Sequence, residues 1–280
     1  MRIAISNIAW DVSDDEAVAA LLRRYEVDAI DTAPGKYFPD PRQATLDDIS
    51  RVRHWWESRG IEITGMQALL FGTTGLNLFG DAATRNAMLV HLDAVCRIGA
   101  GLGATRLVFG SPKNRDRTGL SDTRAETLAI DFFRRLGDIA GNHRVQICLE
   151  PNPPCYGANF MTTSAETAAI VSQVAHPAIW MQLDTGAMTI NGESAEQVIQ
   201  TYAPLIGHVH ASEPNLVTLG DGGCDHLAVG RALNATLPEQ IVTIEMLTAK
   251  TEPCLQAIER ALQVAIRYYR DDSLGHGASV

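Results

Sequence analysis

The chain has 280 residues, of which 46% are hydrophobic and 20% charged, so it carries enough apolar material for a packed core and lacks the composition of a disordered protein. Its formal net charge of −10, with no run of Lys and Arg, disfavours nucleic-acid backbones and anionic membrane surfaces as partners. The composition instead favours a small-molecule substrate.

The first residues enter a strand-like segment without an apolar stretch of signal-peptide length, and no later apolar run is long enough to span a bilayer. We therefore expect a cytoplasmic protein. The cysteines are odd in number and lack zinc-finger spacing, so we expect reduced and mostly buried thiols. They are Cys96, Cys148, Cys155, Cys224 and Cys254.

Short β-branched apolar runs alternate with longer stretches of helical periodicity along the chain, which is typical of repeated βα units and a parallel sheet. Eight strands are expected, at residues 2–6, 27–31, 61–66, 105–110, 145–150, 179–184, 206–211 and 241–246. No glycine fingerprint follows the first strand, where the chain reads Asn7-Ile8-Ala9-Trp10. That absence favours a closed barrel over an open doubly wound sheet.

The predicted fold class is therefore α/β, a single-domain (β/α)8 TIM barrel over residues 1–271, because no Pro, Gly or Ser linker divides the chain. The last helix is expected at about residues 252–270. Beyond it, residues 272–280 show no apolar periodicity, and we predict a flexible C-terminal tail.

Polar residues occur at or near the ends of the last four expected strands: Glu150, Asp184, His210 and Glu245. In a barrel, the carboxyl ends of the strands form the catalytic face. Because side chains alternate along a strand, these four point inward while their apolar neighbours face the helices. Burying three carboxylates without a counter-ion is costly, and few basic residues are nearby. The pattern predicts a divalent-metal site.

Three carboxylates and one imidazole suit Mn²⁺, Mg²⁺, Co²⁺ or Zn²⁺, and the oxygen-rich set favours Mn²⁺, followed by Mg²⁺. A metal that chelates a carbonyl and an adjacent hydroxyl stabilises an enediolate, while two carboxylates remove and return the proton. We therefore predict an isomerase or epimerase of a small sugar or sugar-like hydroxy-carbonyl compound. The alternatives are a metal-dependent lyase or hydrolase acting on a keto-sugar, and a non-catalytic ligand-binding barrel.

Four motifs resemble those of the xylose-isomerase-like barrel superfamily across essentially the whole chain: Leu149-Glu150-Pro151-Asn152, Leu183-Asp184-Thr185-Gly186, His208-Val209-His210 and Ile244-Glu245. The order Glu, Asp, His, Glu is similar to that of the ketose 3-epimerases and hydroxypyruvate isomerases. This resemblance implies that the four residues hold one divalent ion and that Glu150 and Glu245 are also the acid/base pair. It also implies a homo-oligomer, since similar proteins are often dimers or tetramers.

The chain departs from the epimerase pattern three residues after Asp184, where a second histidine usually helps to bind substrate and this sequence has Ala187. His226 is either a replacement imidazole that returns to the site or a solvated residue at the start of a helix. Glu213 is either a substrate contact or a salt-bridge partner. Both interpretations stay open for each residue.

Further candidates for substrate binding are Asn152 and Tyr156, which follow Glu150 closely, and Trp10 and Gln67, which follow early strands. All four are near enough to expected strand ends to line the mouth of the barrel. The predicted substrate-binding set therefore consists of Asn152, Tyr156, Gln67, Trp10, Glu213 and His226.

Other polar residues are assigned to packing or to the surface. His208, one layer below His210, is interpreted as a hydrogen-bonded core residue rather than a ligand. Lys113 and Arg115 are interpreted as exposed surface charges rather than contacts to an anionic substrate. The glycine-rich loop at residues 220–223 lacks the lysine and spacing of a phosphate-binding loop.

Overall fold

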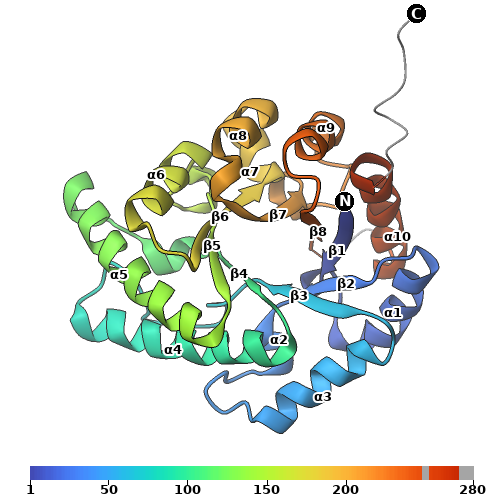
Figure 1. Cartoon of the computed structure of the whole chain (residues 1–280), viewed down its shortest axis with the longest axis horizontal. Helices are drawn as coiled ribbons and strands as arrows, with labels where there is room; N and C mark the ends of the chain where they lie inside the picture. Colours follow the sequence, from blue (N-terminus) through green and yellow to red (C-terminus); the bar gives the residue numbers. More distant parts are fainter. Residues whose placement is uncertain (248–251, 271–280) are drawn as a thin grey trace, which may run out of the picture.

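The computed structural model describes residues 1–247 and 252–270, which form a closed barrel of eight parallel strands ringed by helices (Figure 1). Each strand pairs with the next in sequence, and β8 closes onto β1. The predicted fold class is confirmed, and every expected strand is present with its ends within about two residues of those predicted. The strands are β1 (Arg2–Ser6), β2 (Ala29–Thr32), β3 (Glu62–Met66), β4 (Arg106–Phe109), β5 (Gln146–Leu149), β6 (Ile179–Asp184), β7 (Ile206–Ser212) and β8 (Ile241–Glu245).

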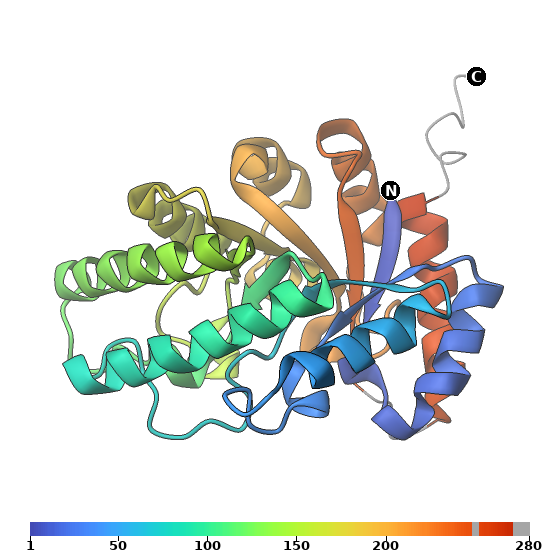
Figure 2. The same ribbon diagram turned by 60° about the horizontal axis from the view of Figure 1, so that its bottom comes forward.

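The helices pack along the outside of the strands, as the tilted view in Figure 2 shows. The α-helices are α1 (Asp15–Arg24), α2 (Pro34–Tyr37), α3 (Leu46–Glu57), α4 (Ala82–Leu102), α5 (Asp122–His143), α6 (Ser164–Val174), α7 (Thr185–Asn191), α8 (Ala195–Tyr202), α9 (His226–Thr236) and α10 (Cys254–Ala265). Single turns η1 (Asn7–Ala9), η2 (Val12–Asp14), η3 (Pro112–Arg115), η4 (Pro154–Tyr156), η5 (Ala203–Leu205) and η6 (Pro214–Leu216) lie between them, and η7 (Ile266–Arg270) follows α10.

Local sequence accounts for where the long helices begin and end. Asp81 caps α4 by accepting a hydrogen bond from the backbone N–H of Thr84, and Gly103 ends the helix in the left-handed conformation. Along α5, Phe132, Phe133 and Leu136 lie on one helical face and are fully buried. These apolar faces fix the helices around the barrel and leave the strand ends to carry the polar residues.

Strand register places the predicted ligands at one mouth of the barrel. Asp184 of β6 is paired with His210 of β7, after a register shift between Met181 and Gln182. Ser212, two residues beyond His210, is paired with Glu245 at the end of β8. Because residues two apart share a face, the side chains of β6, β7 and β8 converge inside the ring.

The predicted tail at residues 272–280, with the predicted domain end at residue 271, lies outside the described residues. Within the described ranges, no helix is long and apolar enough to cross a membrane. All five cysteines are free, as expected, but only Cys96 and Cys148 are buried, while Cys224 and Cys254 are half-buried and Cys155 is exposed. The cytoplasmic location and the homo-oligomer stay predictions.

Candidate metal centre and active site

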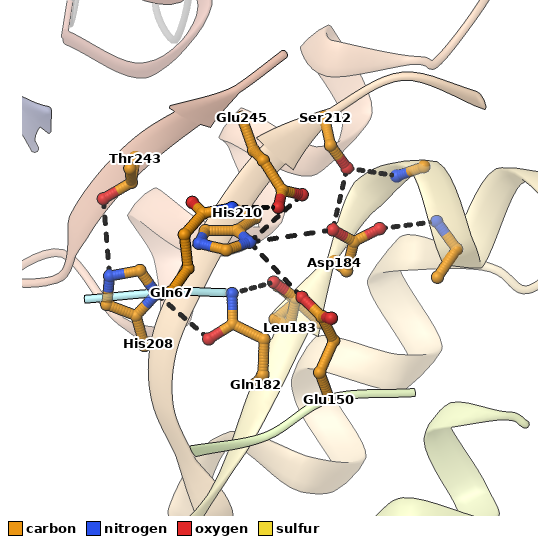
Figure 3. A network of polar contacts seen from close by, with 12 residues as sticks. Gln67, Glu150, Gln182, Leu183, Asp184, His208, His210, Ser212, Thr243 and Glu245 are labelled. Atoms are coloured by element: carbon orange, nitrogen blue, oxygen red, sulfur yellow. Dashed lines mark hydrogen bonds and ion pairs between the residues drawn. The ribbon is translucent and has the colours of Figure 1, made fainter. Parts of the chain in front are cut away.

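The four predicted ligands meet at the carboxyl ends of the last four strands, and all of them are buried. Figure 3 shows their side chains pointing toward one another around the His210 ring. His210 Nδ1 lies 3.4 Å from Glu150 Oε1, 3.3 Å from Glu245 Oε2 and 3.9 Å from Asp184 Oδ2. One ligand atom from each residue can be chosen so that all four atoms lie within 4.8 Å of one another.

Several buried polar atoms of this cluster lack hydrogen-bond partners among the described residues, and their chemistry shows whether the cluster fits a metal. Among the described residues, neither ring nitrogen of His210 nor Glu150 Oε1 makes a hydrogen bond of ordinary geometry. Buried polar atoms almost always have partners, and three carboxylates in one enclosed space repel each other. Oxygen donors with one imidazole nitrogen are a donor set that divalent cations bind. The residues present therefore fit a divalent ion.

The electrostatics of the cluster also indicate that it needs a cation. Burial, and then the carboxylates of Glu245 and Glu150, raise the pKa of Asp184 to about 8. Burial lowers the pKa of His210, but the same two carboxylates outweigh it and raise that pKa well above its ordinary value. The protein alone thus retains protons where negative charge accumulates, and a bound cation would release them.

Neighbouring residues orient two of the carboxylates. Asp184 Oδ1 accepts the backbone N–H of Ala187 at 2.6 Å, and its Oδ2 accepts the Ser212 hydroxyl at 2.9 Å. Glu245 Oε1 accepts Gln67 Nε2 at 2.5 Å. Gln67, predicted to bind substrate, thus contacts Glu245, while its own Oε1 is buried and has no hydrogen-bond partner among the described residues. Such contacts fix the geometry of metal ligands.

Two other substrate-binding candidates lie near the mouth, and one does not. Asn152 Nδ2 donates to Glu150 Oε2 at 3.1 Å, and the partly exposed Tyr156 accepts the backbone N–H of Asn215 at 2.7 Å. Trp10 is 0% exposed, and its indole N–H donates to Asp15 at 2.7 Å. It packs edge-on against Trp56. Trp10 is therefore a core residue, held in place by this buried carboxylate and the second indole.

Glu213 and His226 form a separate buried pair. Glu213 Oε1 lies 3.0 Å from His226 Nε2 and accepts the backbone N–H of Gly220 at 2.8 Å, while Oε2 accepts that of Cys224 at 3.0 Å. His226 Nδ1 lies 2.6 Å from the Tyr269 hydroxyl. His226 therefore does not replace the missing imidazole, and Glu213 is an ion-pair partner that holds the loop after β7. Although Glu213, Cys224 and His226 lie within metal-binding distance of one another, these contacts already occupy the carboxylate and the imidazole.

A Glu213→Gln variant is expected to lose about 1–3 kcal/mol of folding stability at neutral pH, because an amide cannot accept all three donors. Burial opposes ionisation, but His226 and the loop N–H groups lower the pKa of Glu213 from 4.5 to about 2. A carboxylate whose pKa is lower in the folded than in the unfolded state stabilises the fold at pH values above its unfolded-state pKa. That stabilisation is lost as the pH falls through its folded-state pKa. The difference between variant and wild type should therefore shrink from about pH 4.5 down to about 2. Urea unfolding at several pH values measures it, and a pH-independent difference would contradict the assignment.

Beneath the metal cluster lies a second buried pair, His208 and Asp31, of which the sequence pattern indicated only His208. His208 Nε2 lies 2.8 Å from Asp31 Oδ2, and His208 Nδ1 lies 3.0 Å from Gln182 Oε1. His208 is thus a hydrogen-bonded core residue, as expected (Figure 3). A Cβ on Gly65 would lie 2.6 Å from Asp31 Oδ1, so only glycine leaves room for this carboxylate. Asp31 stands near the end of β2, where the strand-end pattern could have identified it.

Arg115 corrects another expectation. Lys113 is exposed, but the Arg115 side chain is 0% exposed and lies beside Glu150. The turn η3 folds back from β4 over the end of β5, and its guanidinium donates to the backbone oxygen of Glu150. A charged residue that the sequence placed at the surface is therefore part of the wall behind the metal cluster.

A cavity of about 480 Å³ opens beside the metal cluster, and both Glu150 and Glu245 line it. Three other polar residues line the cavity, and each already makes a contact: Lys36 Nζ with the backbone oxygen of Trp10, Gln67 Nε2 with Glu245 Oε1, and the Ser111 hydroxyl with Asn114 Oδ1 at 2.6 Å. Most of the remaining wall is apolar, with Ile8, Leu69, Leu70, Phe71, Leu216 and Leu247. The cavity thus joins a charged floor to an apolar wall.

Fold and site together define a single-domain (β/α)8 barrel with a cluster of carboxylates and histidine at the carboxyl ends of its strands. The chain belongs to the xylose isomerase-like TIM barrel family, whose sequence profile matches residues 19–271. This assignment confirms the superfamily that the four motifs indicated.

Known relatives of the chain include sugar epimerases. The D-psicose 3-epimerase of Agrobacterium fabrum is 31% identical over 104 residues, which span 37% of this chain and 36% of that protein, or about a third of its length. A solved D-psicose 3-epimerase studied in the presence of D-fructose has a TM-score of 0.80 at 19% identity, covering 96% of this chain and 99% of the other. An IolI protein with a bound zinc atom has a TM-score of 0.75 at 17% identity, covering 96% and 98%. At these identities the two solved structures show a shared fold.

Proposed function

We propose that the protein is a divalent-metal-dependent isomerase or epimerase of a small sugar or sugar-like hydroxy-carbonyl compound, with Glu150 and Glu245 as the acid/base pair. The observation that carries the proposal is the convergence of four buried donor residues, of which these two glutamates also line the adjoining cavity. The local identity to a D-psicose 3-epimerase supports the same class of reaction.

The ion would be held by Glu150, Asp184, His210 and Glu245, and we propose Mn²⁺ because oxygen donors predominate. Mg²⁺, Co²⁺ and Zn²⁺ fit the same donor types, and the zinc atom in IolI supports metal binding in this fold. When bound, such an ion supplies Lewis-acid stabilisation of the negative charge that develops when the carbon beside a carbonyl loses its proton.

The protein's own groups then move the proton. Glu150 and Glu245 both face the cavity, and each is oriented by a side-chain amide, that of Asn152 or of Gln67. One carboxylate removes the proton from the substrate carbon, and the other returns a proton from the opposite side, which inverts that centre. Return to the neighbouring carbon instead exchanges an aldose and a ketose. The unpartnered Gln67 Oε1 can accept a substrate hydroxyl.

The far end of the substrate would meet the apolar wall, where a hydroxyl would lose contact with water and find no polar side chain on Leu216 or Leu247. Asn215 and Leu216 both adopt positive φ, 60° and 52°, a strained backbone for residues other than glycine. Tyr156 holds the N–H of Asn215, and the N–H of Leu247 donates to the oxygen of Leu216 at 2.9 Å. This held turn favours a substrate with fewer hydroxyl groups at the end remote from the metal.

A matched pair of ketohexoses, one normal and one lacking its 6-hydroxyl, tests both parts of the proposal with Mn²⁺ in D2O. We expect solvent deuterium to enter recovered sugar without bond cleavage, and about 10- to 100-fold higher kcat/KM for the deoxy sugar, since an unpaired buried hydroxyl costs about 1–3 kcal/mol. Leu216→Asn should reduce the ratio of kcat/KM for the deoxy sugar to that for the normal sugar. Leu46→Asn, a change at an exposed leucine, should leave this ratio unchanged.

Three outcomes would contradict these expectations in different ways. Preference for the normal sugar would refute the apolar-end assignment alone. Cleavage products would favour the alternative, a metal-dependent lyase or hydrolase acting on a keto-sugar. The reason for considering this alternative is that Ala187 stands where the epimerases usually have a histidine. The absence of any metal-dependent exchange or turnover across a wider panel of aldoses, ketoses and keto-acids would refute the enzyme assignment.

A further inference from the structure

Arg115 is a charged side chain buried with no charged partner in direct contact. It is 0% exposed, and within the described part of the chain its guanidinium forms no ion pair. Burial lowers the pKa of Arg115 to about 10, which Glu150 partly opposes. Arginine is rarely buried in this way, because its charge and its five donors need compensation. Its contacts show where that compensation comes from.

The guanidinium bridges the two ends of the short segment that follows β5. Its Nη1 donates to the backbone oxygen of Glu150 at 2.8 Å, and its Nη2 donates to Oδ1 of Asn152. A guanidinium can only donate, so it selects the orientation in which the amide oxygen of Asn152 faces Arg115. The amide nitrogen must then face the other way, and it donates to Glu150 Oε2 at 3.1 Å. The arginine therefore fixes a donor against one oxygen of a proposed metal ligand.

The opposite side of the same carboxylate is closed by backbone. A Cβ placed on Gly110 would lie 1.8 Å from Glu150 Oε2, so the carboxylate rests directly on this glycine. Asn152 and Gly110 both lie against Glu150 Oε2, while Oε1 lies 3.4 Å from His210 Nδ1. Glu245 is held differently, since its partner Gln67 is a neutral amide and, within residues 1–247 and 252–270, no group donates a hydrogen bond to Gln67 Oε1.

We propose that Arg115 is a positioning residue that acts through Asn152 to hold Glu150 with one oxygen toward the ion and the other toward the substrate. This inference rests on the proposed function, because it assigns Glu150 both tasks. Asn152, expected from the sequence to bind substrate, becomes the link between a buried cation and the acid/base carboxylate.

The test compares Mn²⁺ affinity, measured by calorimetry, with kcat and KM at saturating Mn²⁺. Arg115→Met is expected to weaken Mn²⁺ binding and lower kcat by about 10- to 100-fold each while KM changes little, as for other partners of metal ligands. Arg115→Lys keeps the charge but cannot donate to both oxygens in the same geometry. Its Mn²⁺ affinity and kcat should therefore lie between those of the wild type and of Arg115→Met. Asn152→Leu should reproduce the loss, and the double variant should lose no more than either single variant.

Arg134→Met is the matched control, since Arg134 likewise donates to two backbone oxygens, those of Val174 and Gln173, but between α5 and α6. It should leave Mn²⁺ affinity and kcat unchanged. If Arg115→Met fails to fold, Arg115→Lys and Asn152→Leu decide the question by the same two measurements.

Lowered thermal stability in the Arg115 variants with wild-type Mn²⁺ affinity and kcat would overturn the positioning role, as would fully additive losses in the double variant. If no sugar is turned over by the wild type and Arg115→Met still weakens Mn²⁺ binding, the proposed activity fails and the positioning of Glu150 stands.

Discussion

A Glu245→Gln variant is expected to lose about 10²- to 10⁴-fold in the rate of solvent-deuterium exchange into a substrate sugar, measured at saturating Mn²⁺. The amide keeps the size of the side chain and its contact with Gln67, but it cannot accept the proton that the carboxylate removes. The variant should also bind Mn²⁺ more weakly, because one charged oxygen is lost from the cluster.

The control for this variant is Glu239→Gln, an exposed glutamate just before β8 and so at the other end of the same strand. It should retain full exchange. If Glu245→Gln kept exchange within a factor of about ten at saturating metal, another group would have to be the base.

Removal of the metal is expected to abolish turnover and to lower the melting temperature. An ion present at about 100 times its dissociation constant stabilises the fold by about 2.7 kcal/mol, which corresponds to roughly 5–10 °C for a chain of this size. A chelator titration followed by calorimetry and by an activity assay measures both effects. Adding Mn²⁺ back should restore turnover and the original melting temperature. Equal activity before and after exhaustive chelation would contradict metal dependence.

The same experiment has a pH dependence whose sign is set by Asp184. Burial and the neighbouring carboxylates raise its pKa to about 8, so below that pH the metal-free protein holds a proton that the ion must displace. Mn²⁺ affinity should therefore fall by up to about tenfold per pH unit as the pH decreases below about 8. The pKa of His210 is also raised well above its ordinary value, so this residue adds a second proton that the ion must displace, and the affinity should level off only once both groups are deprotonated.

The fold and the four cluster residues could be predicted because both depend on local regularities. Alternating apolar runs gave the strands, and the two-residue repeat of a strand determines which side chains face the interior. Thus Asp184 and His210, far apart in sequence, were expected on the same inner face, and the register between β6 and β7 places them side by side. Asp31, near the end of β2, obeys the same regularity.

The remaining errors come from loops, whose course no periodicity encodes. Arg115 was assigned to the surface because isolated arginines usually are exposed, yet the turn after β4 carries it behind Glu150. His226 is a candidate from the sequence for replacing the missing substrate-binding imidazole, but the loop that returns at Gly220 and Cys224 pairs it with Glu213. Such outcomes depend on contacts between segments that are distant in sequence, and single-sequence patterns do not report them.

The strained turn at Asn215 and Leu216 has a consequence for how new activities could arise. The proposed ligands lie at the ends of β5, β6, β7 and β8, whereas the turn, held by Tyr156, forms a separate part of the cavity wall. Substitutions at Leu216 or Leu247 can therefore alter substrate preference while the metal cluster is inherited unchanged. A mutant library confined to such wall positions would explore new sugars from an intact catalytic floor, and gene duplication followed by drift at these positions offers nature the same path.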